Sequence, residues 1–321
     1  MFVRVVGAAL GLLTWGVGGL PAKAEEHPGA VYGFLFENDW AGGRDENYTA
    51  GWQWTRATKR QSEGPVDRYL QLALGQQMYT PQNQNESDPV FDQHPYAGWL
   101  FGEALFVTDR GAGKPIDAIG VQIGVVGPWA LAEEAQDTAH RLVDESTFQG
   151  WDNQIGNQPG LQIHLQRRWT SMRWGQGKWQ ADLQPSISAN LGNVYLSAEV
   201  GGVIRYGKNL DRPLGEHRHQ PGSTGITWFS DQPASARTAY AFFGAQARAV
   251  GYAIWLDGRP FQEDTVTQAS EDFVYDLEGG LSMPLGLGDS RITLSYMRRS
   301  RTFEEQVDAQ GIGRLSLVTR F

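Results

Sequence analysis

The sequence contains no cysteine in its 321 residues, which excludes disulfide frameworks, thiolate zinc sites and cysteine nucleophiles. Positive charge is scarce, with 27 Lys and Arg against 36 Asp and Glu, and the formal net charge is −9. Since no block of Lys and Arg offsets this balance, nucleic acid is not an expected partner. Beyond residue 24 the chain also lacks any run near the ~18 apolar residues that a membrane-spanning helix needs.

The first 24 residues have the features of an export signal. Arg4 provides the positive start, residues 5–20 are apolar apart from Thr14, and Ala22-Lys23-Ala24 fits a cleavage site. A transmembrane anchor would need a longer apolar stretch. The sequence therefore predicts a signal peptide over 1–24 and a mature domain over 25–321.

The mature chain alternates polar and apolar residues with a period of two. Polar residues hold every even position of 182–190, and similar alternation occurs over 119–125, 161–166 and 291–296. A soluble β-sandwich would alternate too, but the export signal, the 12% aromatic content and segments near ten residues favour a membrane barrel. The last segment, 313–321, alternates and ends on Phe321, which resembles the signal that the barrel assembly machinery of outer membranes reads.

Twelve strands are predicted by this pattern. They are expected near 30–39, 48–58, 69–79, 97–108, 117–127, 161–172, 178–190, 195–206, 237–256, 271–285, 290–302 and 312–321. An even number places both termini on the periplasmic side. The fold expected is thus an all-β, 12-stranded antiparallel transmembrane β-barrel, monomeric, with one short extracellular loop helix. The long stretch 207–236 conflicts with a short periplasmic turn, so either that turn is exceptional or the strand count fails there.

The expected helix lies within 128–160. Pro128 opens it, and apolar residues recur at helical spacing up to about Glu145. His140 lies in its middle, with Gln136 one turn before it and Asp144 one turn after. His140 is either an incidental histidine on a solvated loop, or a base presented by a helix that leans over the barrel mouth.

A second group of polar residues follows the first strand. Glu37, Asn38 and Asp39 are followed by Asp45 and Thr49, and the alternation turns Glu37 and Asp39 toward the lumen or rim. Clustered hard oxygen ligands suit Ca²⁺, which takes six to eight of them. The alternative is an acidic rim neutralised by the divalent ions that bridge surface lipopolysaccharide.

Several ordered motifs carry a family resemblance over 30–321. They are Glu37-Asn38-Asp39 with Tyr48-Thr49, Tyr79-Thr80-Pro81, Pro95 to Leu100, Gly127-Pro128 with Gln136 and His140, Gly150 to Gln154, Leu191 to Tyr195, Leu256-Asp257-Gly258 and Arg301 to Gln306. Together they resemble the LpxR family of outer-membrane lipid A 3′-O-deacylases. The chain departs from the family pattern at His94, Gln158 and Ala50, where Arg, Glu and Asn are usual.

The resemblance implies an enzyme of the bacterial outer membrane that hydrolyses ester-linked acyl chains of lipid A, the lipid part of lipopolysaccharide, among the other outer-membrane lipids. It implies His140 as the base that activates water and Ca²⁺ as the cofactor that stabilises the oxyanion. Asn38 and Asp39 are the expected calcium and oxyanion residues, with Thr49, Glu37 and Asp45 as weaker candidates. Two alternatives remain open: a catalytically degenerate channel or structural barrel, and an envelope lipid hydrolase that uses a Ser-His pair.

Overall fold

The computed structural model describes residues 29–42, 46–111, 113–169, 172–175, 177–208, 210, 217–220, 223–227, 239–286 and 289–320. The predicted signal peptide 1–24, Asp45 and Phe321 lie outside the described residues. No helix in the described part is long and apolar enough to cross a membrane.

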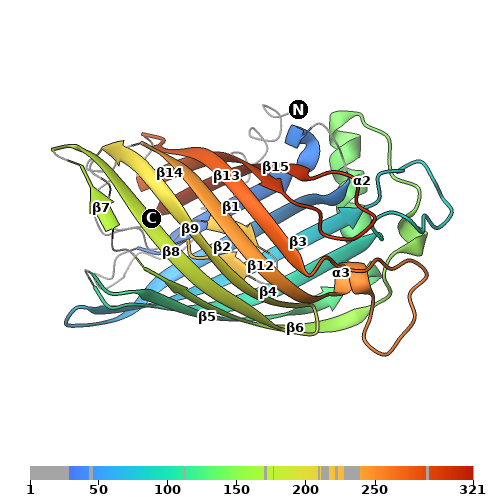
Figure 1. Cartoon of the computed structure of the whole chain (residues 1–321), viewed down its shortest axis with the longest axis horizontal. Coiled ribbons are helices and arrows are strands. Elements are labelled where there is room, and N and C mark those ends of the chain that lie inside the picture. The colour runs from blue at the N-terminus through green and yellow to red at the C-terminus, as the bar shows by residue number, and fades with distance from the viewer. Residues whose placement is uncertain are drawn as a thin grey trace, which may run out of the picture.

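Twelve long antiparallel strands close into a barrel in the described part of the chain (Figure 1). They are β1 (Val31–Asn38), β2 (Asn47–Glu63), β3 (Val66–Thr80), β4 (Ala97–Asp109), β5 (Ile116–Val126), β6 (Gln158–Arg168), β8 (Trp179–Gly192), β9 (Tyr195–Lys208), β12 (Tyr240–Ala253), β13 (Phe273–Pro284), β14 (Asp289–Arg299) and β15 (Gln310–Arg320). Each strand pairs with its neighbours in sequence, and β1 pairs with β15 to close the ring. The twelve predicted strands are therefore confirmed, with ends that shift by a few residues.

Short elements complete the fold. They are the 3₁₀ turns η1 (Asp39–Gly42), η2 (Pro128–Ala130) and η3 (Trp151–Asn153), the helices α2 (Ala132–Val143) and α3 (Ile254–Asp257), and the short strands β7 (Met172–Trp174), β10 (His217–Gln220) and β11 (Ser223–Gly225). Val31 pairs with Arg320, so both ends of the described chain lie at one end of the barrel, which is the periplasmic end. α2 and α3 lie at the opposite, extracellular end (Figure 1).

One predicted strand was too long. The expected strand 237–256 stops at Ala253, because the chain turns there into the four-residue helix α3. The Asp257 carboxylate accepts the Ala253 N–H at 2.6 Å, and Gly258 follows at φ 82°, a backbone conformation that favours glycine. These local bonds close a helical turn that the alternation does not reveal.

The two faces of the barrel wall, which is the cylinder formed by the twelve strands, have opposite polarity. Outward residues such as Leu74, Ile123 and Leu161 are half to two-thirds exposed, whereas inward residues such as Gln122 and Gln162 are buried. An apolar outer face and a polar interior are what a bilayer demands of a spanning barrel. The predicted alternation of Leu161 and Gln162 is confirmed.

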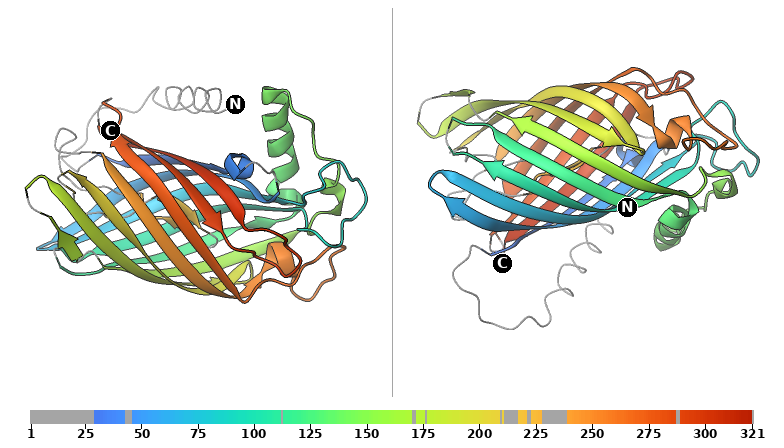
Figure 2. Two further views of the ribbon diagram at one scale, coloured as in Figure 1. Left: turned by 45° about the horizontal axis from the view of Figure 1, so that its top comes forward. Right: turned by 90° about the horizontal axis from the view of Figure 1, so that it is seen from below.

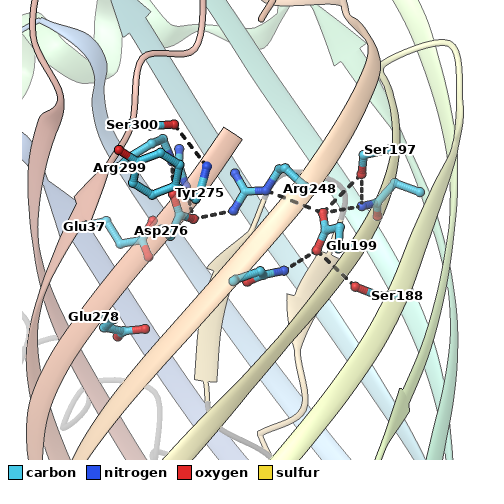
Figure 3. A network of polar contacts seen from close by, with 12 residues as sticks. Glu37, Ser188, Ser197, Glu199, Arg248, Tyr275, Asp276, Glu278, Arg299 and Ser300 are labelled. Carbon is cyan, nitrogen blue, oxygen red and sulfur yellow. Dashed lines mark hydrogen bonds and ion pairs between the residues drawn. The ribbon is translucent and has the colours of Figure 1, made fainter. Parts of the chain in front are cut away.

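Ion pairs fill the middle of the lumen. Asp276 lies between Arg248 and Arg299, and the Arg299 Nε is 3.0 Å from its carboxylate (Figure 3). Glu199 accepts hydrogen bonds from Ser188 and Asn190, both at 3.0 Å. Charges buried in this way are stable only when they are paired and hydrogen-bonded, so these side chains hold one another in place across the interior.

Aromatic rings cross the lumen nearer the extracellular end. Tyr195, Trp255 and Tyr79 stack in turn, with ring centroids 5.2 Å and 4.8 Å apart. His94 stacks on Tyr79 at 5.2 Å, and Phe303 meets the His94 ring edge-on at 5.8 Å. The cavity beside these rings has a volume of only about 30 Å³. The stacked rings therefore occupy this part of the lumen and leave little space beside them.

The long connection between β9 and β12 explains the conflict in the predicted turn lengths. Much of 207–236 lies outside the described residues, but Ile226 is buried among inward side chains of the periplasmic half, including Tyr69 and Leu105. The Thr227 N–H donates to the Gln71 side chain at 2.8 Å, and the Gln71 amide donates to the Gly225 carbonyl at 2.7 Å. The predicted strand count is correct, and the turn is exceptional because part of it enters the lumen.

Candidate active site

The helix that carries His140 packs on the outer wall of the barrel. Figure 2 shows α2 outside the ring of strands, at the extracellular end. Ala132 lies in one apolar cluster with Met78 of β3, Phe148 and Trp151, and Trp52 of β2 packs against this cluster. Met78 and Trp52 share the outward parity of the exposed Leu74. Of the two alternatives for His140, the helix that leans over the mouth is therefore corrected, because the apolar side of α2 is seated on the outer wall.

A glycine allows this close packing. Gly98 lies on the outward face of β4, and a Cβ atom there would be 2.6 Å from the Ala132 Cβ. The Gly98 carbonyl also accepts the Gly127 N–H at 3.0 Å, just before η2. The helix can therefore lie directly against the strand backbone, where a larger residue would push it away.

The His140 ring is fixed in one orientation. It is 8% exposed, and the Phe148 ring meets it edge-on at a centroid distance of 5.0 Å. Nδ1 lies 2.6 Å from the Ser146 carbonyl oxygen. Because a carbonyl oxygen only accepts, Nδ1 carries the proton in the neutral ring, and Nε2 keeps the lone pair that a base requires.

Asp144, one turn after His140, ends the helix, and the His140 Nδ1 bonds the Ser146 carbonyl. It caps the C-terminus of α2 at φ 64°, and its backbone N–H donates to the His140 carbonyl. The chain turns in a left-handed conformation at Asp144, which brings the Ser146 carbonyl back to the ring. The backbone of the return loop thus orients the His140 ring.

Gln136, one turn before His140, links the helix to the loop that follows it. Its Oε1 accepts the Trp151 indole N–H at 2.8 Å, and the Trp151 ring packs on Tyr96 at a centroid distance of 4.9 Å. Gln136 is only 4% exposed. These contacts join three motifs of the sequence, 95–100, 136–140 and 150–154, into one unit on the wall.

Asn38 and Thr49 share the outer face with α2. Asn38 pairs with the outward Ala50, and its amide donates to the Thr49 carbonyl at 3.2 Å. The Thr49 hydroxyl lies 2.5 Å from the Thr80 hydroxyl at the end of β3. η1, which follows Asn38 directly, lies beside α2 at the same end of the barrel (Figures 1 and 2). The structure therefore brings Asn38 and Thr49 to the extracellular end of the wall where α2 is seated.

Thr80 is a neighbour of the site that the sequence reasoning recognised only as part of the Tyr79-Thr80-Pro81 motif. It is fully buried. A threonine at the last outward position of β3, next to a proline, was the available signal.

Glu37 lies on the other side of the wall. Its carboxylate pairs with Arg314 in the lumen and accepts the Tyr48 hydroxyl at 2.7 Å. Arg314 also contacts Glu278 at 2.9 Å. The expected inward orientation is confirmed, but a carboxylate neutralised by arginine inside the barrel does not fit a calcium ligand beside Asn38.

Asp39 lies at the rim, where β1 ends and η1 begins. It is fully buried, and its Oδ2 accepts the Glu46 N–H at 2.5 Å and the Gln310 amide at 3.4 Å. These bonds draw together the two ends of the connection that contains Asp45. The buried Asp39 therefore does not behave as part of an exposed acidic coat.

The donor chemistry of Asn38 and Asp39 fits a hard cation, because an amide oxygen and a carboxylate are ligands of the kind that Ca²⁺ prefers. Glu37 does not fit, for the reason given above. No group of three or more His, Asp or Glu that could hold a metal occurs among the described residues, which do not include Asp45. The calcium requirement stays a prediction.

His94, which occupies a position where the family usually has Arg, is part of the lumen. It is 2% exposed, its Nδ1 donates to the Pro95 carbonyl at 2.6 Å, and burial lowers the pKa of His94 to about 4. A ring enclosed by Tyr79 and Phe303 inside the barrel has no path to an ester on the outer wall. His94 is therefore not a candidate base.

The histidines also bear on the Ser-His alternative. The side chains of His94, His140 and His164 are described, and their Nδ1 atoms bond Pro95, Ser146 and Asn190 through carbonyl or amide oxygens. None of these three rings bonds a serine hydroxyl. The geometry of these three histidines thus provides no Ser-His pair.

A closed barrel with an apolar outer face, a filled polar lumen and a polar site on its outer wall defines an integral β-barrel protein of the bacterial outer membrane. The family described as "Outer membrane protein LpxR" matches residues 8–321. This chain belongs to the LpxR family, and its location is the outer membrane.

A solved structure shows the same fold. LpxR from Salmonella typhimurium superimposes with a TM-score of 0.76 at 19% identity, covering 91% of this chain and 100% of that one. The β domain of the Bordetella autotransporter BrkA reaches a TM-score of 0.47 at 10% identity, over 92% of this chain and 100% of that one. No curated protein sequence matches this chain.

Proposed function

We propose that this protein hydrolyses ester-linked acyl chains of lipid A, with the 3′-O-linked chain as the expected target. The observation that carries the proposal is the His140 ring, held with its Nδ1 proton on the Ser146 carbonyl and seated with α2 on the outer wall. Membership of the LpxR family supports the same function.

The position of the site suits a lipid substrate. The outer wall below α2 consists of apolar side chains such as Leu72 and Leu74, which are about half exposed. Lipid A lies in the outer leaflet, so its acyl chains would contact these side chains while its ester groups lie near the extracellular ends of the strands. A site inside the lumen would be closed to the same molecule by the ion pairs and stacked rings.

The chemistry follows from the fixed imidazole. Nε2 of His140 takes a proton from water, the hydroxide oxygen bonds to the ester carbonyl carbon, and the bond from that carbon to the sugar oxygen then breaks. His140 returns the proton to the sugar oxygen, so the products are a fatty acid and a free hydroxyl on lipid A. Ca²⁺ bound near Asn38 and Asp39 would supply charge stabilisation for the carbonyl oxygen.

Lipid A from cells with and without this protein tests the proposal directly. Mass spectrometry should show a lipid A species that has lost one acyl chain only when the protein is present. His140→Ala, which retains the barrel because α2 lies outside the strand ladder, should lower the deacylation rate roughly 10²-fold or more. Identical lipid A in both cell types would reject the function, and normal turnover by folded His140→Ala would reject the base.

A further inference from the structure

A glutamine occupies a position of the barrel wall that would otherwise face lipid. On β3 the outward residues Leu72 and Leu74 are 46% and 50% exposed, whereas Gln76, the next outward residue, is 2% exposed. A polar amide on the apolar side of a spanning strand is costly unless its hydrogen bonds are made. Its burial therefore requires a partner on the outer side of the wall.

Both ends of the Gln76 amide are bonded. Oε1 accepts the indole N–H of Trp52 from the neighbouring strand β2 at 2.8 Å. Nε2 donates to the carbonyl of Ala130 at 2.6 Å. Ala130 is the last residue of η2 and is followed by Leu131, the N-cap of α2. One side chain thus joins two strands of the wall to the first turn of the helix that carries His140.

The bond to Ala130 acts together with the close contact at Gly98. Gly98 admits the Ala132 side chain against β4, and its carbonyl accepts the Gly127 N–H just before η2. Gln76 adds a second bond, to the Ala130 carbonyl at the end of η2, which fixes the start of α2 along the wall. Because α2 is a single rigid helix from Ala132 to Val143, a shift at its start is carried to His140.

We propose that Gln76 is the positioning residue of this site: through its bond to Ala130 it holds α2, and with it His140, at the distance from the wall that the reaction needs. This inference rests on the proposed function, since it assigns His140 as the base. Gln76 itself touches neither the water nor the ester. A misplacement of about 1 Å in a reacting group can lower a rate by about 10²-fold, so a loosened helix should act on catalysis.

Three variants distinguish the effect of the bond between Gln76 and Trp52 from that of the bond between Gln76 and Ala130. Gln76→Leu removes both bonds and leaves an apolar side chain like that of Leu74. Gln76→Glu keeps an acceptor for the Trp52 indole but has no N–H for the Ala130 carbonyl. Trp52→Phe removes the indole donor and leaves the bond from Gln76 to Ala130 in place. Leu74→Ala is the matched control, because it changes the preceding outward position of the same strand without touching α2.

The experiment uses the full-length mature barrel in detergent, with heat-modifiable gel mobility as the check on folding. Amide hydrogen exchange of 132–143 reports on the seating of α2, and kcat and KM are measured on lipopolysaccharide micelles. Gln76→Leu and Gln76→Glu should raise exchange in α2 by about 10-fold and lower kcat by about 10-fold or more, with KM changed less than about twofold. Trp52→Phe should have smaller effects, and Leu74→Ala none.

The inference would be overturned, while the proposed function stands, by unchanged exchange in α2 of folded Gln76→Leu, or by faster exchange with unchanged kcat. A loss of kcat equal to that of Leu74→Ala would also overturn it, because the effect would then come from the wall alone. A wild-type protein without deacylase activity rejects the proposed function, and the positioning role fails with it.

Discussion

His94 makes the stability of the extracellular end depend on pH in a way that can be calculated. Burial lowers the pKa of this histidine from 6.5 to about 4, because the ring is packed against Tyr79 and Phe303, where a charge is poorly solvated. Between pH 6.5 and about 4, His94 is protonated in the unfolded chain but stays neutral in the folded chain. Stability is therefore complete above pH 6.5 and is lost as the pH falls toward 4.

The size of the loss follows from the two pKa values. One pKa unit corresponds to ~1.4 kcal/mol, so the difference between 6.5 and about 4 gives roughly 3 kcal/mol of unfolding free energy lost by pH 4. His94→Phe is the matched variant, since phenylalanine can stack on Tyr79 but cannot titrate. It loses the bond to the Pro95 carbonyl, which costs about 1 kcal/mol at all pH values.

The assay is denaturant unfolding in detergent, followed by tryptophan fluorescence, for both proteins between pH 7 and pH 4. Carboxylates elsewhere titrate in both, so the difference between the two curves isolates His94. We expect that difference to change by roughly 3 kcal/mol in favour of His94→Phe at the acid end. Parallel curves for the two proteins would refute the assignment of a buried neutral ring.

The remaining predictions concern the metal and the residues at the end of β1. Chelation of calcium should abolish deacylation and Mg²⁺ should restore it poorly, because Mg²⁺ demands a tighter octahedral shell; full activity in excess chelator would contradict this. Asp39→Ala should lower the rate at least 10²-fold, and Asn38→Ala should lower it less. Deacylation rates of the folded barrels, measured against calcium concentration, check this, and a wild-type rate and calcium response in Asp39→Ala would remove Asp39 from the metal site. Glu37→Gln should leave the calcium response unchanged and lower barrel stability by roughly 1–3 kcal/mol, because Arg314 loses a buried partner; denaturant unfolding checks this, and a shifted calcium response would return Glu37 to the metal site.

The strands could be predicted from the sequence because the bilayer imposes the same rule on every one of them. Each outward residue meets lipid and each inward residue meets the lumen, so Leu161 and Gln162 show their orientation in their chemistry alone. The rule does not apply where the wall is covered. Gln76 interrupts the apolar outer face of β3, and the position of α2 explains it.

The position of α2 could not be predicted for a related reason. Its apolar residues reveal that one side is buried, but both the barrel mouth and the outer wall could cover that side. The deciding features are Gly98 and the η2 turn, whose roles depend on contacts between residues far apart in sequence. The same holds for 225–227, whose bonds to Gln71 in the lumen follow no periodic pattern.

The contiguous residues 37–39 at the end of β1 have different roles because they lie on different sides of the barrel wall. Glu37 and Asn38 are neighbours in the chain, yet successive side chains of a strand point to opposite faces, and the wall is only one strand thick. Glu37 therefore joins the ion pairs that fill the lumen, while Asn38 faces Thr49 on the outer wall. Asp39 does not follow this alternation, because β1 ends before it and η1 begins at it. Its carboxylate accepts the Glu46 N–H at the rim. Three successive polar residues thus contribute to the lumen, to the outer site and to the connection after β1. A metal centre could not use all three as ligands, because Glu37 and Asn38 lie on opposite faces of the wall.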